Sequence, residues 1–460
     1  MTMKAIICCV LSAAAFWFGH GVADVWPLAW LAPAPVLWLA YGEERAWRVG
    51  AVAFLAYLVG QGGLLSPYLP LMGPIVVVLA AVPALAFTGA VMAARLAWRR
   101  LPAAAAAFVF PALWTVLEWG YSLVSLNGSF GSWAYSQVSA PLLIQSAAVF
   151  GLWSITFSLA LFASFGALLV VKRSRVVAGL MLALLAMNLA WGAWRLAQPA
   201  GPAVRVAASA RDNVRAGARD MAASQAAEVR VLAGQGAQVI VFPEKVAPMP
   251  AAQRDAALDP LIAAARETGV TVVTGFDEQG PAGRRNAAYT ITPAGVVGDY
   301  AKRHFVPGLE TGYAAGPGAG LLGAGRSVAI CKDMDFHATL RGDAIAGHAQ
   351  PGGLRLMLVP AWDFDADAWT HARMAVMRGV EGGYAIARSA SNGLVTLTDS
   401  RGRMVARGAS GQTRHFAVVA DLPGGTGPTP YLKIGDAFAW ACGVLALILL
   451  GWAAVVRRRV

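Results

Sequence analysis

The feature that most constrains this sequence is a series of long apolar runs. They lie at about 5–19, 25–41, 50–72, 74–94, 103–121, 142–171, 177–194 and 437–456. A membrane-spanning helix needs roughly 20 apolar residues in succession, and runs of this length differ from the alternating patterns of soluble proteins. Composition agrees, because 57% of the residues are hydrophobic and only 13% are charged, against roughly a quarter charged in soluble domains. The sequence therefore predicts a multi-pass membrane protein.

Positive charges in the short connections predict the orientation of these spans, because Lys and Arg in short loops stay on the cytoplasmic side. Basic residues occupy every second connection: Lys4; Arg45 and Arg48; Arg95, Arg99 and Arg100; Lys172, Arg173 and Arg175; Arg457 to Arg459. We therefore expect a seven-helix transmembrane domain at 1–196, an outward domain at 197–435, and a last helix with a basic cytoplasmic tail at 436–460. In a bacterium, the outward side is the periplasmic side of the inner membrane.

The net charge of +12 does not indicate nucleic-acid binding, because much of the excess lies in these topogenic loops. The first run could also be a cleavable signal peptide. No small-x-small cleavage site closes that run and further spans follow it, so we interpret it as a span.

The four cysteines are unevenly placed. Cys8 and Cys9 lie in the first apolar run and Cys442 in the last, where a cysteine behaves as a small hydrophobe. Cys331 is alone in the outward domain, with no disulfide partner there. In an oxidising compartment such a residue is either a reactive thiol or an inert buried one, and both interpretations stay open at this point.

The outward domain alternates strand-like and helix-like segments, as in an α/β domain. "AQVIVFPE", "VTVVTGFD", "RSVAICKD" and "LRLMLVPAWD" predict strands, 252–268 a helix, and "AAYTITPAGVVGDYAKRH" and "GLVTLTDSRGRMVARG" hairpins. Glu244, Lys302 and Cys331 each follow or end a strand, where open α/β folds gather catalytic groups. Strand ends are also wet, so Glu244 and Lys302 could equally be ordinary surface charges.

Several common site motifs are missing from the sequence. It has no H-E-x-x-H, paired C-x-x-C, G-x-S-x-G or P-loop, which argues against a zinc site, an elbow serine hydrolase and a nucleotide phosphate site. We expect no metal and no cofactor. "GAGLLG" at 318–323 fits G-x-G-x-x-G but follows a Gly/Pro-rich loop rather than a strand, so we interpret it as flexible loop. What remains is a thiol that needs a base, a positive charge and oxyanion donors.

Three motifs in order carry a resemblance. "VFPEKVAP", "GDYAKRHFVPGLE" and "VAICKDMDF" are similar in order, spacing and context to the Glu, Lys and Cys motifs of the nitrilase (carbon-nitrogen hydrolase) superfamily, and "WTHARMAVMRGVEGGYAIARSASNG" resembles the segment that follows the nucleophile there. With helices before this domain and one after it, the whole chain resembles the apolipoprotein N-acyltransferase family. The resemblance implies an α-β-β-α sandwich for the outward domain.

The resemblance also implies roles for individual residues. Glu244 would be the general base, Lys302 the stabiliser of the tetrahedral intermediate and Cys331 the acyl-accepting nucleophile. Glu310 matches a second glutamate near the thiol, and the backbone N–H of Lys332 would donate to the oxyanion. This chain has Lys332 and Asp333 where these acyltransferases typically have Tyr-Glu. Lys332 could lower the pKa of the thiol, or pair with Asp333 or Asp335.

Four further residues are candidates for the same site. Asp363 follows the strand in "PAWDFD", and His371, Arg378 and Glu381 have helical spacing in "THARMAVMRGVE". The last three could instead form a solvated face or structural ion pairs.

The leading hypothesis is a membrane N-acyltransferase. By resemblance, its acyl donor is a phospholipid and its acceptor is the α-amino group of a diacylglyceryl-lipoprotein; both substrates stay in the bilayer. We expect it to act as a monomer. One alternative is a membrane-anchored nitrilase-like amidase or hydrolase, in which water resolves the thioester. Another is a binding or scaffold module with a vestigial triad.

Overall fold

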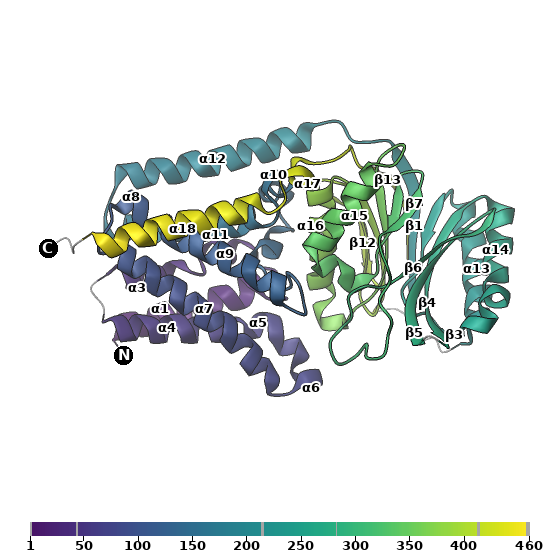
Figure 1. Ribbon diagram of the computed structural model, residues 1–460, viewed down its shortest axis with the longest axis horizontal. Coiled ribbons are helices and arrows are strands. Elements are labelled where there is room, and N and C mark those ends of the chain that lie inside the picture. Colours follow the sequence, from purple (N-terminus) through teal and green to yellow (C-terminus); the bar gives the residue numbers. More distant parts are fainter. Residues whose placement is uncertain (1, 43–44, 213–215, 282, 412–414, 457–460) are drawn as a thin grey trace. The chain divides into compact units, whose positions relative to one another are not determined.

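The computed structural model describes residues 2–42, 45–212, 216–281, 283–411 and 415–456 (Figure 1). Arg457 to Arg459, expected to form the basic tail, lie outside the described residues. The chain divides into two compact units. The first comprises Met1–Ser125, Gly131–Ala197 and Ile434–Val460, and we call it the membrane unit after its predicted spans. The second comprises Leu126–Phe130 and Gln198–Lys433, and we call it the catalytic unit after the active site expected in it.

Within the described residues, the membrane unit contains seven helical segments that are long and apolar enough to cross a bilayer. They are Met3–His20, Ala46–Met72, Ile75–Trp98, Ala103–Val124, Trp153–Val171, Arg175–Ala197 and Ala437–Val455. The run expected at 25–41 forms two short helices, α2 (Pro27–Leu31) and α3 (Ala34–Tyr41). At 1.5 Å per residue, Pro27–Tyr41 is shorter than the roughly 30 Å of a hydrocarbon core.

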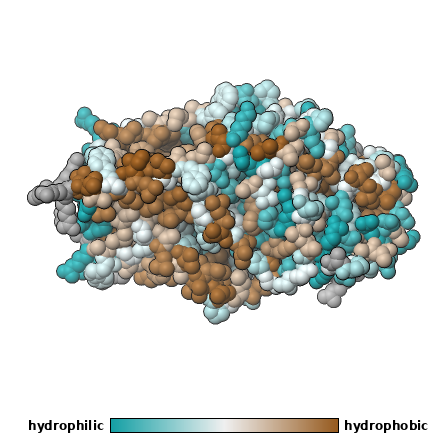
Figure 2. Space-filling model, viewed as in Figure 1, coloured by the Kyte–Doolittle hydropathy of each residue, from teal (hydrophilic) through white to brown (hydrophobic). Residues whose placement is uncertain are grey.

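The outward faces of these helices are apolar. On α7 (Ile75–Trp98), Val78 is 58% and Leu85 is 63% exposed, and on α18 (Ala437–Val455), Leu447 is 74% exposed. Figure 2 shows the brown, hydrophobic surface of this unit. Such a continuous apolar surface is costly in water and favourable in lipid, which agrees with the predicted spans.

Two sheets form the centre of the catalytic unit. The first has the order β13-β1-β2-β4-β5-β6, with β3 beside β4, and the second has the order β12-β11-β10-β9-β8-β7. The first sheet comprises β1 (Ala203–Arg211), β2 (Val239–Val241), β3 (Pro248–Pro250), β4 (Thr271–Gly280), β5 (Gly283–Thr292), β6 (Gly295–Ala301) and β13 (His415–Pro423). The second comprises β7 (Gly320–Gly323), β8 (Arg326–Val328), β9 (Leu356–Trp362), β10 (Ala385–Ser391), β11 (Leu394–Thr398) and β12 (Met404–Ala409).

Side-chain alternation along the strands builds the layers. In β2, Val239 and Val241 face the core shared by the two sheets, whereas Ile240 packs with helices α13 (Ala218–Gly234) and α14 (Arg254–Thr268). In β9, Leu358 faces the shared core and Met357 packs with α15 (His337–His348) and α16 (Ala368–Gly382). Successive strand residues point to opposite faces, so the unit is an α-β-β-α sandwich, and the predicted fold class is confirmed.

Two local expectations were wrong. "GAGLLG" is not simply loop, because Gly320–Gly323 forms the edge strand β7, antiparallel to β8. A Cβ on Gly320 would lie 2.4 Å from the carbonyl oxygen of Val328, so this pairing requires glycine. Because strands are recognised in a sequence by their β-branched residues, a strand that begins with glycine is not predicted. The strand expected to end at Cys331 ends at Val328, and Cys331 begins the short 3₁₀ turn η5 (Cys331–Asp335).

Candidate active site

Three loops at strand ends carry the central candidates. Glu244 lies three residues after β2, Lys302 directly follows β6, and Cys331 begins η5. The chain at Glu244 approaches β4 closely, because a Cβ on Gly275 would lie 2.6 Å from the Cα of Glu244. Glycine at position 275 therefore lets this loop sit against the sheet.

Lys302 lies between two carboxylates. Its Nζ is 3.3 Å from Oε2 of Glu244 and 2.9 Å from Oε2 of Glu310. Asn286 on β5 donates from Nδ2 to both carboxylates, at 3.2 Å to Glu244 and 3.0 Å to Glu310. Lys245 also donates to Glu310, at 3.0 Å. Glu244, Lys302 and Glu310 are buried, so these contacts are made away from bulk water.

Burial and charge act differently on the groups of this cluster. Burial raises the pKa of Glu244, although the ammonium groups of Lys302 and Lys245 oppose that rise. Burial alone would raise the pKa of Glu310 too, but the ammonium of Lys302 and its neighbours outweigh it and lower that pKa to about 2. Burial works against the charged form of Lys302, yet the negative charges around it raise its pKa above the ordinary value. Glu244 and Glu310 together therefore hold Lys302 charged, and Glu244 is the more readily protonated of the two carboxylates.

Cys331 has a free thiol and a strained backbone. Its φ is +43°, in the left-handed region that a non-glycine residue seldom adopts. The thiol donates to the carbonyl oxygen of Trp362, with Sγ 3.4 Å away. Burial, and then the charge of Glu244, raise the pKa of Cys331 to about 12, while Lys302 opposes the rise. The resting residue is therefore a thiol that must lose its proton before it can attack.

Backbone strain is concentrated in this part of the unit. Lys245 and Asn392, which line a pocket beside Glu244, both have a φ of +48°. Each such conformation costs of order 1–3 kcal/mol and persists only where the surroundings enforce it. This clustering is typical of a functional site.

Asp333 joins the turn that carries Cys331, η5 (the nucleophile turn), to the residues that directly follow Lys302, the lysine loop. It accepts from the backbone N–H groups of Arg303 and His304, at 3.1 and 3.0 Å, and from Tyr300 Oη at 2.6 Å. It also accepts from the backbone N–H of Ile330, at 3.1 Å. Although burial opposes its charge, the hydrogen bonds from His304 and Tyr300 keep the pKa of Asp333 below its ordinary value. A carboxylate at this position therefore ties the residue before Cys331 to the residues after Lys302.

Lys332 pairs with Asp335, which was one of the expected alternatives, and not with Asp333. Its buried Nζ is 3.2 Å from Oδ2 of Asp335 and donates to Oδ1 of Asn127 at 2.7 Å. Burial has the largest effect on the pKa of Cys331, and the nearby charges that shift it are those of Glu244, Lys302, Asp363 and Arg388.

Asp363 lies close enough to affect the thiol, but it is part of an ion pair. The two terminal nitrogens of the Arg388 guanidinium contact its carboxylate, Nη1 at 2.9 Å, and both residues are buried. Arg388 lies on β10, and its charge opposes that of Asp363 at Cys331. Asp363 and Arg388 therefore form a nearly neutral wall of the site.

The three candidates on α16 are placed differently. Arg378 and Glu381 form a buried ion pair, with Nη2 3.1 Å from Oε2, so the predicted structural pair is present and the solvated face is not. His371 Nε2 lies 3.0 Å from Oδ2 of Asp367. Arg378 and Glu381 contact each other within α16, and His371 contacts the residue that precedes this helix.

Sequence reasoning missed Asn286 and Arg388. Each had a detectable signal: a polar side chain inside an otherwise apolar strand, in "RRNAAYTIT" and "YAIARSAS". A buried polar or charged group of this kind needs a partner, and here the partners are the carboxylates around the thiol.

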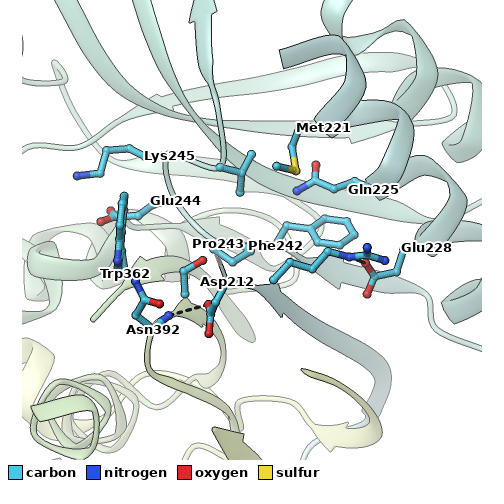
Figure 3. Close-up of a pocket in the computed structure, with 13 residues that line it drawn as sticks. Asp212, Met221, Gln225, Glu228, Phe242, Pro243, Glu244, Lys245, Trp362 and Asn392 are labelled. Carbon is cyan, nitrogen blue, oxygen red and sulfur yellow. Dashed lines mark hydrogen bonds and ion pairs between the residues drawn. The ribbon is translucent and has the colours of Figure 1, made fainter. Parts of the chain in front are cut away.

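A pocket of about 260 Å³ opens beside the cluster. Figure 3 shows Glu244 and Trp362 at one end and Glu228 at the other. Asp212 and Asn392 also line it, and the backbone N–H of Asn392 donates to Asp212 at 2.8 Å. Of the cluster residues, Glu244 and Lys245 line this pocket.

Comparison with known proteins agrees with this architecture. Residues 12–165 match the model of the apolipoprotein N-acyltransferase N-terminal domain, and residues 188–414 match that of the carbon-nitrogen hydrolase domain. The apolipoprotein N-acyltransferase of Azotobacter vinelandii is 31% identical, over 95% of this chain and 92% of its own length. That of Geobacter metallireducens is 26% identical, over 90% and 89%.

Some solved structures are similar over about half of this chain. An amidase of the nitrilase superfamily from Nesterenkonia is 22% identical, with a TM-score of 0.44, and the match covers 53% of this chain and 98% of the amidase. The curated relatives, in contrast, match across nearly the whole chain, spans included.

Proposed function

Because this chain belongs to the apolipoprotein N-acyltransferase family, we propose that it moves an acyl chain from a phospholipid, through a thioester on Cys331, to the N-terminal amine of a lipoprotein. The observation that carries the proposal is the buried Lys302, held between Glu244 and Glu310 and acting electrostatically on the Cys331 thiol. One carboxylate is free to change protonation while the other keeps the lysine charged.

In the first half-reaction, Glu244 takes the proton from Sγ of Cys331. The thiolate attacks the sn-1 ester carbonyl of the phospholipid and forms a carbon–sulfur bond. Lys302 and the backbone N–H of Lys332 stabilise the resulting oxyanion. When the tetrahedral intermediate collapses, the ester C–O bond breaks and the lysophospholipid alkoxide takes the proton from Glu244.

In the second half-reaction, the acceptor amine attacks the thioester carbonyl and gives a proton to Glu244. The carbon–sulfur bond breaks, the thiolate leaves as an amide forms, and Glu244 returns the proton to Cys331. The raised pKa of Glu244 suits both transfers, because a base works best when its pKa lies near the working pH.

The bilayer brings both substrates to this site. Each buried CH₂ of an acyl chain contributes about 0.8 kcal/mol to membrane retention, so neither lipid leaves readily. The basic residues of alternate connections support an inner-membrane location with the catalytic unit on the periplasmic side.

A two-substrate assay tests this function. The purified protein in detergent–lipid micelles receives a phospholipid with a labelled sn-1 acyl chain and a diacylglyceryl peptide with a free α-amine. We expect label on the peptide amine and an equal amount of lysophospholipid, with both lost in Cys331→Ala. Release of labelled free acid without labelled peptide would indicate the hydrolase instead.

A further inference from the structure

The turn that carries Cys331 needs support from its surroundings. A 3₁₀ segment of five residues has poor internal hydrogen bonding, and a left-handed conformation at a non-glycine residue costs about 1–2 kcal/mol. Asp333 supports one side of the turn, through the lysine loop. The opposite side is supported by a different part of the chain.

That support is the segment Leu126–Phe130, which belongs to the catalytic unit although it connects α9 (Val109–Val124) to η2 (Trp133–Gln137) in the sequence. Ser129 donates twice to the carbonyl oxygen of Asp335, from its backbone N–H at 2.9 Å and from Oγ at 2.6 Å. Asn127 Oδ1 accepts from Nζ of Lys332 at 2.7 Å. The segment therefore contacts both ends of the turn.

The backbone of this segment lies close to the backbone of the turn that carries Cys331. Gly128 has a φ of +51°, and a Cβ there would lie 2.5 Å from the carbonyl oxygen of Asp335. The ring of Phe130 lies against His371 on α16, with centroids 5.9 Å apart. Glycine at 128 therefore permits the backbone contact, and Phe130 fixes the end of the segment.

The contacts of Lys332 with Asp335 and Asn127 indicate a structural role for its side chain. Its side chain is buried, its ammonium is neutralised by Asp335, and Asn127 satisfies a further donor. A charge compensated in this way contributes little field at a neighbouring thiol. A side chain held at its tip does, however, fix the backbone from which it extends.

We propose that Asn127 and Lys332 are positioning residues, and that the contact between them holds the nucleophile turn so that the Cys331 thiol and the backbone N–H of Lys332 meet the same acyl carbonyl. The inference rests on the proposed acyl transfer. Lysine at position 332 then matches the asparagine of this particular segment, rather than activating the thiol by charge.

The test measures the rate of acyl-adduct formation on Cys331 from a short-chain phospholipid, by intact mass, in the full-length protein. Asn127→Ala removes the contact and leaves the Lys332–Asp335 pair in place. We expect its rate to fall about 10- to 100-fold, the scale of a small misplacement of reacting groups. Asn127→Asp keeps an acceptor for the ammonium and should restore most of the rate. Leu126→Ala, at a 73% exposed neighbour, is the matched control and should keep it.

A second variant guards against misfolding. Lys332→Met with Asp335→Asn removes the buried pair together and leaves no unpaired charge. It should be as slow as Asn127→Ala, and adding Asn127→Ala to it should cause no further loss, because both changes break one contact.

The pH dependence of Cys331 alkylation separates positioning from electrostatic activation. We expect its midpoint to be the same in the parent and in these variants. A parental adduct rate in Asn127→Ala, a loss that only follows the folded fraction, or a raised alkylation midpoint would each overturn the positioning role. An absent adduct in the parent would defeat the proposed function itself.

Discussion

The catalytic unit buries two groups of charged residues whose environments differ. The first is the cluster of Glu244, Lys302 and Glu310, in which two carboxylates share one ammonium near a thiol. The second is the pair of Arg378 and Glu381 on α16, in which a guanidinium and a carboxylate contact each other. Both groups are buried, so burial alone does not identify a catalytic group. Burial raises the pKa of Glu244 and the charge of Glu310 adds to that rise, although Lys302 and Lys245 oppose it, and a carboxylate with a raised pKa suits proton transfer.

The largest effect should come from the shared lysine. Lys302→Met removes the positive charge that the proposed mechanism assigns to the oxyanion, so we expect acyl-adduct formation to fall by about 10²–10³-fold or more. Intact-mass kinetics give this rate, and thermal melting reports the folded fraction.

A compensated variant makes that result interpretable. Lys302→Met with Glu310→Gln leaves the cluster with its original net charge and should fold better than the single variant, yet it should remain equally inactive. Restored activity in the double variant would mean that Lys302 serves only to neutralise Glu310.

A smaller effect is expected from Glu310→Gln, which leaves Glu244 as the charged carboxylate in contact with Lys302, so that the cluster more closely resembles the pair of Arg378 and Glu381. The charge of Glu310 contributes to the raised pKa of Glu244, so its removal should lower that pKa. Glu244 must be deprotonated to act as a base, and the rate is therefore lost as pH falls through its pKa. We expect the acid limb of the pH–rate profile to move to lower pH; a limb that stays in place or moves upward would contradict this assignment.

The smallest effect on catalysis should come from a change in the pair of Arg378 and Glu381. Arg378→Met removes the guanidinium that contacts the buried Glu381 carboxylate and should lower the free energy of unfolding by about 3–5 kcal/mol. The acyl-adduct rate per folded molecule should stay at the parental value, measured after correcting for the folded fraction. A reduced rate in fully folded protein would place the pair in the catalytic machinery.

These two groups also show what could be predicted from the sequence. Apolar run lengths predict the spans, and strand-like segments alternating with helices predict the layers, because both patterns are local. The resemblance of the ordered Glu, Lys and Cys motifs implied that Glu244 and Lys302 share a site, whereas their positions after strands left them open as surface charges; their atoms lie 3.3 Å apart. Their catalytic roles remain predictions.

Other features depend on contacts between distant parts of the chain. Arg388 meets Asp363 only because β9 and β10 are paired, and Asn127 reaches Lys332 across 205 positions of the sequence. The left-handed Cys331 is likewise fixed by its surroundings, since no residue preference favours a cysteine there. Local sequence patterns do not indicate such pairings, so the partners of Lys332 cannot be predicted from them.

The most direct test of the account is the mass of the protein after incubation with phospholipid and no acceptor. The account predicts that one acyl chain is added, that the adduct maps to Cys331, and that hydroxylamine releases it, as expected of a thioester. Cys331→Ala should gain no mass, whereas Cys442→Ala, which removes a thiol buried in α18, should be acylated normally. A well-folded parent protein that transfers acyl chains to the acceptor peptide without this adduct, or a Cys331→Ala variant that still does so, would contradict it.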